Sequence, residues 1–353
     1  MITLIKSLCK NLLAIAIICI AGIVMQSCVH EFPEINNSLN VRLKISHYTD
    51  WTEFDYFIDN LPDTRKTRAG DNNSWQAQYV VAVYAKGTTS TPIQRYSFTR
   101  EDLTLADFET ELSLPVGEWD IYVWQDFVNQ NVDPPYYNSS DFKAITYEKP
   151  YRGDTNMRDA FEGKTSVKVP ETIEADYVVT GEIEMERPLA KYVFIATDFE
   201  EFYNDSMTRF QLPVEKNASS DPNSVAQQRD ALTGFSVVAK YPWYMPAVYD
   251  MFSQKVTDSW TGMYYDALIN PISNTEAVIA SDYVFINHHE SGAQVQLGMR
   301  TPDDAIIGLT STINVPLLRG RITYVRGRFL TASTGSGLEI DFSFSGSFDI
   351  LIK

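Results

Sequence analysis

The sequence predicts an all-β protein made of two tandem antiparallel β-sandwiches, with few short helices. Apolar and polar residues alternate with period 2 along many short segments, which indicates strands with one buried face. Turns rich in Gly, Pro and Asn separate these segments, as is typical of sandwiches and barrels. No unit of about 20–50 residues repeats, so a solenoid is not expected.

Residues 1–27 have the composition of a secretory signal peptide. Lys6 and Lys10 form a basic start, and an apolar stretch of Leu, Ile, Ala and Val follows over 11–25. This stretch is shorter than the about 20 residues of a comfortable membrane span. Cys28 comes directly after a small residue, which is similar to the lipobox of bacterial lipoprotein precursors, where the thiol is acylated and becomes the mature N-terminus. The alternative is an ordinary signal peptide with an incidental cysteine.

The distribution of cysteines supports the lipoprotein interpretation. Cys9 and Cys19 lie inside the signal peptide and would be removed with it, which leaves Cys28 alone. Exported proteins normally use cysteines in pairs, as disulfides. A single thiol at the cleavage point is better explained by acylation. We therefore expect acyl chains such as palmitate on Cys28, and not a transmembrane helix, to hold the mature protein to a membrane.

The charge of the chain excludes one class of partner. The formal net charge is −17, and removal of 1–27 leaves 27 basic against 46 acidic residues, a net charge of −19. Nucleic acid is therefore not expected as a partner, because phosphate binding needs clustered Lys and Arg. The same charge argues against an anionic membrane surface as a docking partner beyond the lipid itself. A hydrophobic content of 44% is that of a folded protein with real cores.

The mature chain is long enough for a tether and two domains of ordinary size. The predicted divisions are 1–27 for the signal peptide, 28–40 for the lipid-proximal tether, 41–187 for the N-terminal sandwich and 188–353 for the C-terminal sandwich. The boundary is placed where Arg187 and Pro188 interrupt the strand pattern.

The N-terminal half contains strands of two kinds. Val41, Leu43 and Ile45 share one face of a half-buried strand, whereas 79–84 is apolar on both faces, as in a central strand. Further strands are predicted at 108–114, at 119–124 as its hairpin partner, and at 177–186, where three glutamates form a solvated outer face. The polar stretch 63–74 ends in turn-forming residues and is predicted to be a loop.

The C-terminal half continues the β pattern. One short helix is expected within 197–207, followed by a polar loop over 215–230. Strands are predicted at 189–196, 235–239, 277–287, 294–299, 321–330 and 338–352.

Neither catalysis nor a cofactor is expected. The sequence has four His and no G-x-S-x-G motif around a serine, so a nucleophilic triad is not indicated. His288 and His289 could suggest a metal site, but adjacent residues at a strand end point to opposite faces. No H-x-x-x-H, C-x-x-C or Asp-rich calcium loop occurs. The sequence therefore predicts no enzyme, no metal and no cofactor.

Three short features suggest binding or modification. Trp243 and Trp260 could stack on sugars, although aromatic residues are equally common in sandwich cores. Arg152-Gly153-Asp154 matches a three-residue integrin motif, and the sequence from Asp205 to Met207 is similar to a short acceptor for bacterial O-glycans. Matches this short are expected by chance, so neither carries a function.

Eight segments resemble, in order, the fimbrillin class of type V pilus subunits and related surface lipoproteins. They are 30–33 (HEFP), 79–84 (YVVAVY), 117–126 (GEWDIYVWQD), 157–163 (MRDAFEG), 187–191 (RPLAK), 282–287 (DYVFIN), 314–319 (NVPLLR) and 322–331 (ITYVRGRFLT). Together they span nearly the whole mature chain. The chain departs from the class at Arg319-Gly320, where such proteins often have Arg-Asn.

The resemblance implies two sandwiches of transthyretin-like or immunoglobulin-like type and a structural role without catalysis. It also implies lipid-anchored export to the outer membrane, at the cell surface or within a fimbria, with other pilus subunits or a second copy as partners. In that class a protease cuts after an arginine, the first strand leaves, and a neighbour's strand fills the groove by β-augmentation. The corresponding parts here are a leaving strand at 39–48, a cleavable loop with Arg65 and Arg68, and a donor strand at 338–352.

Two alternatives stay open. The first strand could remain in place, as in an anchor subunit or a monomeric relative. A protein of another class, a glycan-binding surface lipoprotein of a nutrient-uptake system, would use exposed aromatic residues such as Trp243 and Trp260. Exposed Trp and Tyr in one row would favour the second alternative, and an exchangeable strand would favour fibre assembly.

Overall fold

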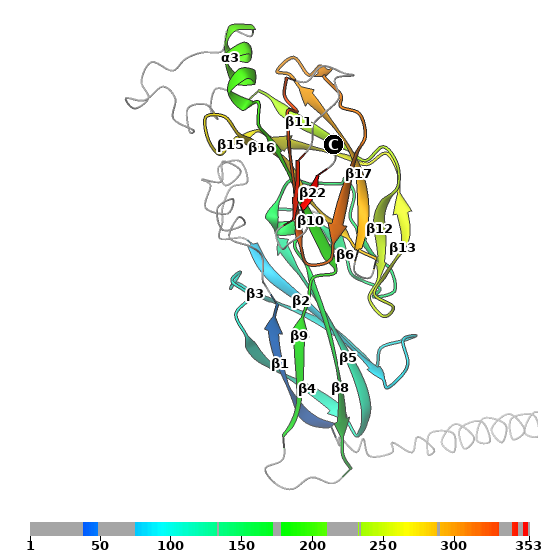
Figure 1. Cartoon of the computed structure of the whole chain (residues 1–353). Coiled ribbons are helices and arrows are strands. Elements are labelled where there is room, and N and C mark those ends of the chain that lie inside the picture. Colours follow the sequence, from blue (N-terminus) through cyan, green and yellow to red (C-terminus); the bar gives the residue numbers. More distant parts are fainter. Residues whose placement is uncertain are drawn as a thin grey trace, which may run out of the picture.

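The computed structural model describes residues 38–48, 75–132, 134–171, 178–209, 232, 234–287, 290–331, 341–344 and 349–351. Within these residues the protein is almost entirely β-structure and forms sandwiches, as the alternation predicts. The strands within 38–129 and 161–185 occupy the lower part of Figure 1, and those of the C-terminal half occupy the upper part.

The N-terminal sandwich packs a three-stranded sheet against a four-stranded sheet. Its strands are β1 (Ser38–His47), β2 (Trp75–Ala85), β3 (Gln94–Arg100), β4 (Phe108–Pro115), β5 (Gly117–Asn129), β8 (Phe161–Val169) and β9 (Val179–Met185). The first sheet has the order β4-β1-β9, with β1 antiparallel to β4 and parallel to β9. The second has the order β3-β2-β5-β8 and is antiparallel throughout. The sequence predicted five of these strands but not β3 and β8. The prediction that 119–124 is the hairpin partner of 108–114 is wrong, because β4 pairs with β1 whereas β5 pairs with β2 and β8 in the other sheet. The parallel pair of β1 and β9 was not predicted either.

The C-terminal half contains a six-stranded and a five-stranded sheet. Its strands are β10 (Leu189–Ala196), β11 (Ser236–Lys240), β14 (Tyr264–Leu268), β15 (Asn270–Pro271), β16 (Ala277–Phe285), β17 (Glu290–Arg300), β18 (Ile306–Ile307), β19 (Ile313–Leu318), β20 (Ile322–Gly327), β21 (Asp341–Phe344) and β22 (Asp349–Leu351). The six-stranded sheet has the order β15-β16-β10-β20-β21-β22. The other has the order β14-β11-β17-β18, with β19 also paired to β17.

A fifth sheet joins the two halves. Its strands are β6 (Tyr137–Asn138), β7 (Ile145–Tyr147), β12 (Met245–Asp250) and β13 (Lys255–Trp260), in the order β13-β12-β7-β6. Because β6 and β7 come from the connection between β5 and β8, this part of the N-terminal half pairs with C-terminal strands. The predicted boundary at 187 and 188 stays a prediction.

The two faces of strand β2 pack in two different hydrophobic cores. Tyr79, Val81 and Val83 pack in the N-terminal core. Val80, Ala82 and Tyr84, on the other face, pack in the large C-terminal core. The prediction that 79–84 is a central strand with two apolar faces is thereby confirmed.

Two local predictions differ from the structure. The helix α3 (Phe199–Arg209) begins and ends two residues later than predicted. The prediction of one long strand over 338–352 is wrong, because β21 and β22 form an antiparallel pair within it. The residues between them include Ser345, Gly346 and Ser347, and small residues of this kind favour a chain reversal. None of the described helices is long and apolar enough to cross a membrane.

Candidate functional site

The first described strand fills a slot between two others. We call the space between β4 and β9 that β1 occupies the β1 slot. Each inward residue of β1 has a partner on both sides, since Leu43 lies opposite Thr110 of β4 and Gly181 of β9. The inward side chains Val41, Leu43 and Ile45 are 0–1% exposed. The strand therefore satisfies two backbone edges and supplies part of the N-terminal core.

The slot is shaped for side chains of medium size. A Cβ on Gly181 would lie 3.0 Å from the Cδ2 atom of Leu43 and 3.0 Å from the Cγ1 atom of Val167. Glycine at this position leaves the room that Leu43 takes. On the outer face, Arg42 pairs with Glu109 at 3.5 Å and Lys44 with Glu182 at 3.9 Å, through side chains that are 42–78% exposed. These outer ion pairs are screened and weak, so backbone pairing and apolar burial hold the strand.

The C-terminal end of β1 reaches the boundary between the halves. The ring of His47 makes edge contacts with Tyr79 and Phe161, and its Nε2 atom lies 3.2 Å from the Tyr79 hydroxyl. Burial lowers the pKa of His47 to about 4, so the ring is neutral at pH 7. The guanidinium of Arg187 donates to the carbonyl oxygen of Tyr48 at 3.5 Å.

Beside the slot, buried ion pairs link the N-terminal segment 158–162 to residues 187, 282 and 319. We call this group of residues the junction. Among the described residues these pairs are Arg158–Asp282 at 2.9 Å, Arg187–Asp159 at 2.9 Å and Arg319–Glu162 at 2.5 Å. The side chains are 0–13% exposed. The N-terminal partners lie in the 3-10 helix η3 (Asn156–Arg158), at the start of β8 and between the two. The junction therefore concentrates charge where the two halves meet.

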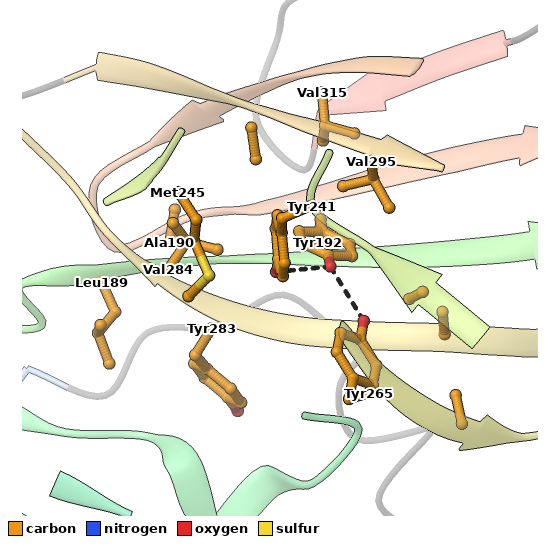
Figure 2. Close-up of a cluster of buried hydrophobic side chains, with 14 of the residues drawn as sticks. Leu189, Ala190, Tyr192, Tyr241, Met245, Tyr265, Tyr283, Val284, Val295 and Val315 are labelled. Atoms are coloured by element: carbon orange, nitrogen blue, oxygen red, sulfur yellow. Dashed lines mark hydrogen bonds between the residues drawn. The ribbon is translucent and has the colours of Figure 1, made fainter. Parts of the chain in front are cut away.

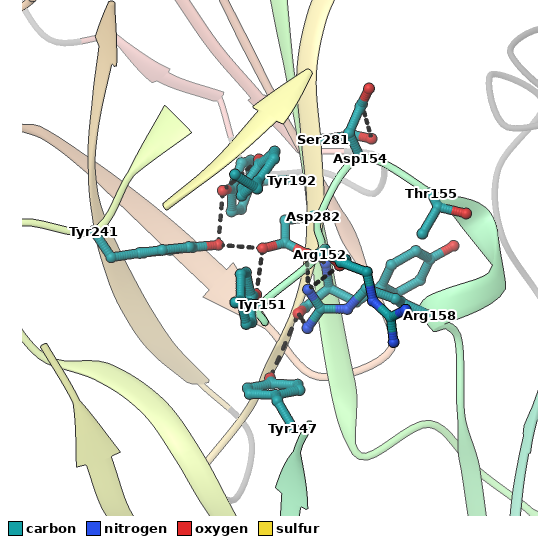
Figure 3. A network of polar contacts seen from close by, with 12 residues as sticks. Tyr147, Tyr151, Arg152, Asp154, Thr155, Arg158, Tyr192, Tyr241, Ser281 and Asp282 are labelled. Atoms are coloured by element: carbon teal, nitrogen blue, oxygen red, sulfur yellow. Dashed lines mark hydrogen bonds and ion pairs between the residues drawn. The ribbon is translucent and has the colours of Figure 1, made fainter. Parts of the chain in front are cut away.

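Hydrogen bonds satisfy the charge of Asp282 at the centre of the junction (Figure 3). One carboxylate oxygen accepts from the hydroxyls of Tyr151 at 2.5 Å and Tyr241 at 2.6 Å. From Tyr241 the chain of hydroxyls continues to Tyr192 at 2.7 Å and to Tyr265 at 2.9 Å (Figure 2). A buried charge that is paired and fully hydrogen-bonded requires one geometry, so these contacts fix the position of the segment around η3.

Hydrogen bonds also hold the other two ion pairs of the junction in place. Glu162 also accepts from the hydroxyl of Tyr249 at 2.7 Å, and Arg319 donates to the carbonyl oxygen of Arg187 at 2.9 Å. Burial raises the pKa of Glu162, and the charge of Arg319 opposes that rise. Arg187 lies over the ring of Phe161 at 4.5 Å, the same ring that His47 touches. The slot and the junction are thus in contact through Phe161.

The sequence-predicted sugar contacts have different surroundings. Trp243, between β11 and β12, is 59% exposed. Trp260 ends β13 and is half-buried, with the Lys149 ammonium 4.5 Å from its ring centre. One face of Trp260 is therefore already covered.

Two short motifs are hidden in the fold. Asp154, the acid of the Arg-Gly-Asp sequence, is buried and accepts hydrogen bonds from the Ser281 hydroxyl and the Leu268 N–H. Ser206 on α3 is 2% exposed, which does not fit a surface acceptor for a glycan.

The remaining predicted sites lie outside the described residues. They are the lipidation residue Cys28, the candidate cleavage residues Arg65 and Arg68, and the pair His288-His289. Within the described ranges no group of three or more His, Cys, Asp or Glu residues could hold a metal ion.

Comparisons place the chain among related sequences and folds. The model of a family described as "Family of unknown function (DUF6562)" matches residues 36–352. No curated protein matches the sequence.

Solved structures resemble the chain over most of its length. The fimbrial anchor protein Mfa2 from Porphyromonas gingivalis is 11% identical with a TM-score of 0.41, covering 88% of this chain and 98% of that one. A fimbrial assembly protein from Parabacteroides distasonis is 14% identical with a TM-score of 0.39, covering 87% and 96%. The tip fimbrial protein Mfa3 from Porphyromonas gingivalis, with C-terminal truncation, is 10% identical with a TM-score of 0.41, covering 87% and 99%. These scores and identities are too low to transfer a function.

Proposed function

This chain belongs to the DUF6562 family of unknown function, and we propose that it is a non-catalytic subunit or anchor of a cell-surface fibre. In this proposal its β1 slot accepts a strand from a neighbouring subunit. One observation carries the proposal. The first of the described strands lies between two others, and its contacts there are backbone pairing and three buried apolar side chains.

A slot of this kind suits exchange on physical grounds. Without β1, the facing edges of β4 and β9 would present unpaired backbone groups, and the pockets of Val41, Leu43 and Ile45 would be open to water. Any extended segment with apolar residues at alternate positions could satisfy both. Burial of each such side chain contributes about 1.5–3 kcal/mol, so an empty slot would bind a matching strand strongly.

Cleavage of the chain would release the strand that fills the slot. Residues 49–74 connect β1 to β2 and contain Arg65 and Arg68, the candidate cleavage positions. After a cut there, β1 would leave together with the acylated Cys28. Without a cut, β1 would stay and the lipid would hold the protein to the outer membrane as an anchor.

The test uses an arginine-specific protease and a labelled peptide. Mature protein beginning at Cys28 is cleaved, the protease is inhibited, and a fluorescent peptide with the sequence of residues 38–48 is added. We expect mass spectrometry to show cleavage after Arg65 or Arg68, and size-exclusion chromatography to show the peptide bound to cleaved but not to intact protein. The control peptide carries Val41→Asp, Leu43→Asp and Ile45→Asp, and should not bind.

The outcomes separate the two roles. Absence of cleavage at Arg65 and Arg68 would contradict the exchanging subunit and leave the anchor. Cleavage followed by equal binding of both peptides, or of neither, would contradict strand exchange at the slot.

Lipid attachment has a separate test. Metabolic labelling of cells with alkyne-tagged palmitate should label the protein, and Cys28→Ser should abolish the label. Equal labelling of the two proteins would contradict acylation at Cys28.

A further inference from the structure

Three exposed aromatic rings lie on two adjacent segments of the C-terminal half. Trp243 and Tyr244, between β11 and β12, are 59% and 74% exposed, and Tyr264, the first residue of β14, is 57% exposed. Of the other aromatic residues that the structure describes, most are buried, such as Trp124 and Tyr79 at 0% exposed, although Tyr48 is 49% exposed. Exposed large rings on a folded surface indicate a contact with another molecule.

Strand pairing brings the two segments that carry these rings together. Lys240 lies opposite Tyr264, and the N–H of Tyr241 donates to the carbonyl oxygen of Met263 at 2.8 Å. The N–H of Gly262 donates back to the carbonyl oxygen of Tyr241 at 3.2 Å. The chain therefore passes from β11 toward Trp243 directly beside the residues that precede Tyr264.

The faces of these rings are free for a ligand. In the described part of the chain, no ring–ring or cation–π contact involves Trp243, Tyr244 or Tyr264. By contrast, the nearby Trp260 is covered by Lys149. The exposed side chains of Lys240 and Asp266 lie on the same face of the sheet as Tyr264. The Oδ1 atom of Asp266 already accepts from Arg300 at 3.0 Å, whereas the Lys240 ammonium can donate to a ligand.

Free rings next to hydrogen-bonding groups fit a sugar. The C–H groups on one side of a pyranose ring pack on an aromatic face, while its hydroxyls bond to polar neighbours. Given about 200 Å² for each ring and the exposures above, the rings present roughly 400 Å². A stable protein interface buries about 800 Å² on each partner, so the area suits a short stretch of glycan better. A formal net charge of −17 repels acidic polysaccharides.

We propose that Trp243, Tyr244 and Tyr264 form a binding site for a neutral glycan chain. This site is separate from the β1 slot, because its residues belong to the C-terminal half, whereas β1 pairs with β4 and β9 of the N-terminal sandwich.

Affinity electrophoresis tests the site on the mature protein. Native gels contain mannan, glycogen or xyloglucan as neutral probes, polygalacturonate as an acidic probe, or no polysaccharide. We expect the wild type to be retarded in at least one neutral gel. The affinity of the variant Trp243→Ala/Tyr244→Ala/Tyr264→Ala for the polysaccharide should fall by a factor of at least about ten, because the variant loses three stacking surfaces. The control variant Ile93→Ala/Ile307→Ala removes exposed aliphatic side chains elsewhere and should be retarded like the wild type.

Three results would contradict the proposed glycan site. These results are no retardation of the wild type in any neutral gel, retardation by polygalacturonate alone, and equal retardation of the wild type and the triple variant. Sedimentation velocity tests the alternative that the three rings form a protein–protein interface. A wild-type dimer that the triple variant loses would assign the rings to a protein interface. An unchanged melting temperature shows that the variant is folded.

Discussion

The β1 slot and the junction are neighbours that share Phe161, and both are buried, but different contacts hold them. In the slot, Val41, Leu43 and Ile45 meet apolar surroundings, and the backbone of β1 pairs with two strands. In the junction, each charged group has one ion-pair partner, such as Asp282 for Arg158 at 2.9 Å, and further hydrogen bonds that hold it in place. Apolar burial is tolerant of sequence, whereas a buried ion pair tolerates one arrangement.

This difference divides the molecule into a replaceable and a permanent part. A segment from another chain can reproduce an alternating pattern and a backbone ladder. It cannot easily reproduce the ion pairs and tyrosine hydroxyls around Asp282, which come from both halves of one chain. We infer that exchange takes place in the slot while the junction keeps the two sandwiches together.

The largest expected effect is at the junction. Arg158→Met leaves the carboxylate of Asp282 buried without its cation, which should lower the free energy of unfolding by about 3–5 kcal/mol. Urea denaturation measures the change. Arg328→Met, which removes the exposed pair with Glu201, serves as the control and should have almost no effect. Equal midpoints for the two variants would show that the junction does not hold the halves together.

The next effect is in the slot. Leu43→Ala removes a fully buried side chain from the pocket above Gly181 and should lower the free energy of unfolding by about 2–5 kcal/mol. The same change in the labelled peptide should weaken its binding to cleaved protein. An unaffected peptide would show that this pocket does not select the donor strand.

A buried carboxyl that has no ion-pair partner among the described residues lies on the junction side of β5. Asp126 shares the face of Trp124, whose ring packs in the C-terminal core, and its Oδ1 atom has no hydrogen-bond partner. Burial raises the pKa of Asp126 to about 7. The folded state therefore binds more protons than the unfolded state between about pH 4 and 7, and stability falls as the pH rises through that window.

The substitution Asp126→Asn should remove the loss of stability that accompanies ionisation of this carboxyl. A rise of about three pKa units corresponds to at most about 4 kcal/mol, and relaxation around the carboxyl reduces this to about 2 kcal/mol. The variant should be the more stable protein at pH 8, and the difference should shrink by pH 4, as measured by urea midpoints. A variant that is less stable than the wild type at pH 8 would contradict the prediction.

His47, at the end of the slot, should respond to pH in the opposite direction. Its pKa is about 4 in the folded state, below the value of about 6.5 expected when unfolded. The folded state binds fewer protons between these values, so stability is lost as the pH falls from 6.5 to 4. Allowing for the partial exposure of the ring, we expect a loss of about 1–2 kcal/mol.

The variant His47→Gln separates this contribution from other titrations. Glutamine stays neutral, so the loss of stability between pH 6.5 and 4 should be smaller in the variant by the contribution of His47. If wild type and variant have the same pH dependence, the ring does not titrate as its burial implies. Together with Asp126, the result would show whether acid weakens the slot while it strengthens the junction.

The sequence predicted the slot better than the junction. Alternation at Val41, Leu43 and Ile45 identified the strand and its inward face, and both are confirmed. It could not identify β9 as a parallel partner more than 130 positions away, because a period reveals faces and not neighbours. The sequence prediction also missed the reversal between β21 and β22, although Ser345, Gly346 and Ser347 lie between these strands.

The junction was missed because charged residues are expected on the surface. Arg158, Asp282 and Arg319 lie far apart in the sequence, and each was noted only within a segment that resembles a family. One signal was available. Asp282 interrupts the apolar run 277–285, all nine residues of which are buried, and a charge within such a run requires a buried partner. The identity of that partner cannot be found without the fold.

The smallest expected effect completes the comparison. Lys44→Ala removes the outer ion pair with Glu182, whose side chain is 78% exposed, and should change the free energy of unfolding by less than about 0.5 kcal/mol. A peptide with this change should bind cleaved protein as well as the unchanged peptide does. Because the outer face of β1 contributes so little, a donor strand needs to match the inward pattern alone. A clear loss of peptide binding would mean that surface charge also selects the donor.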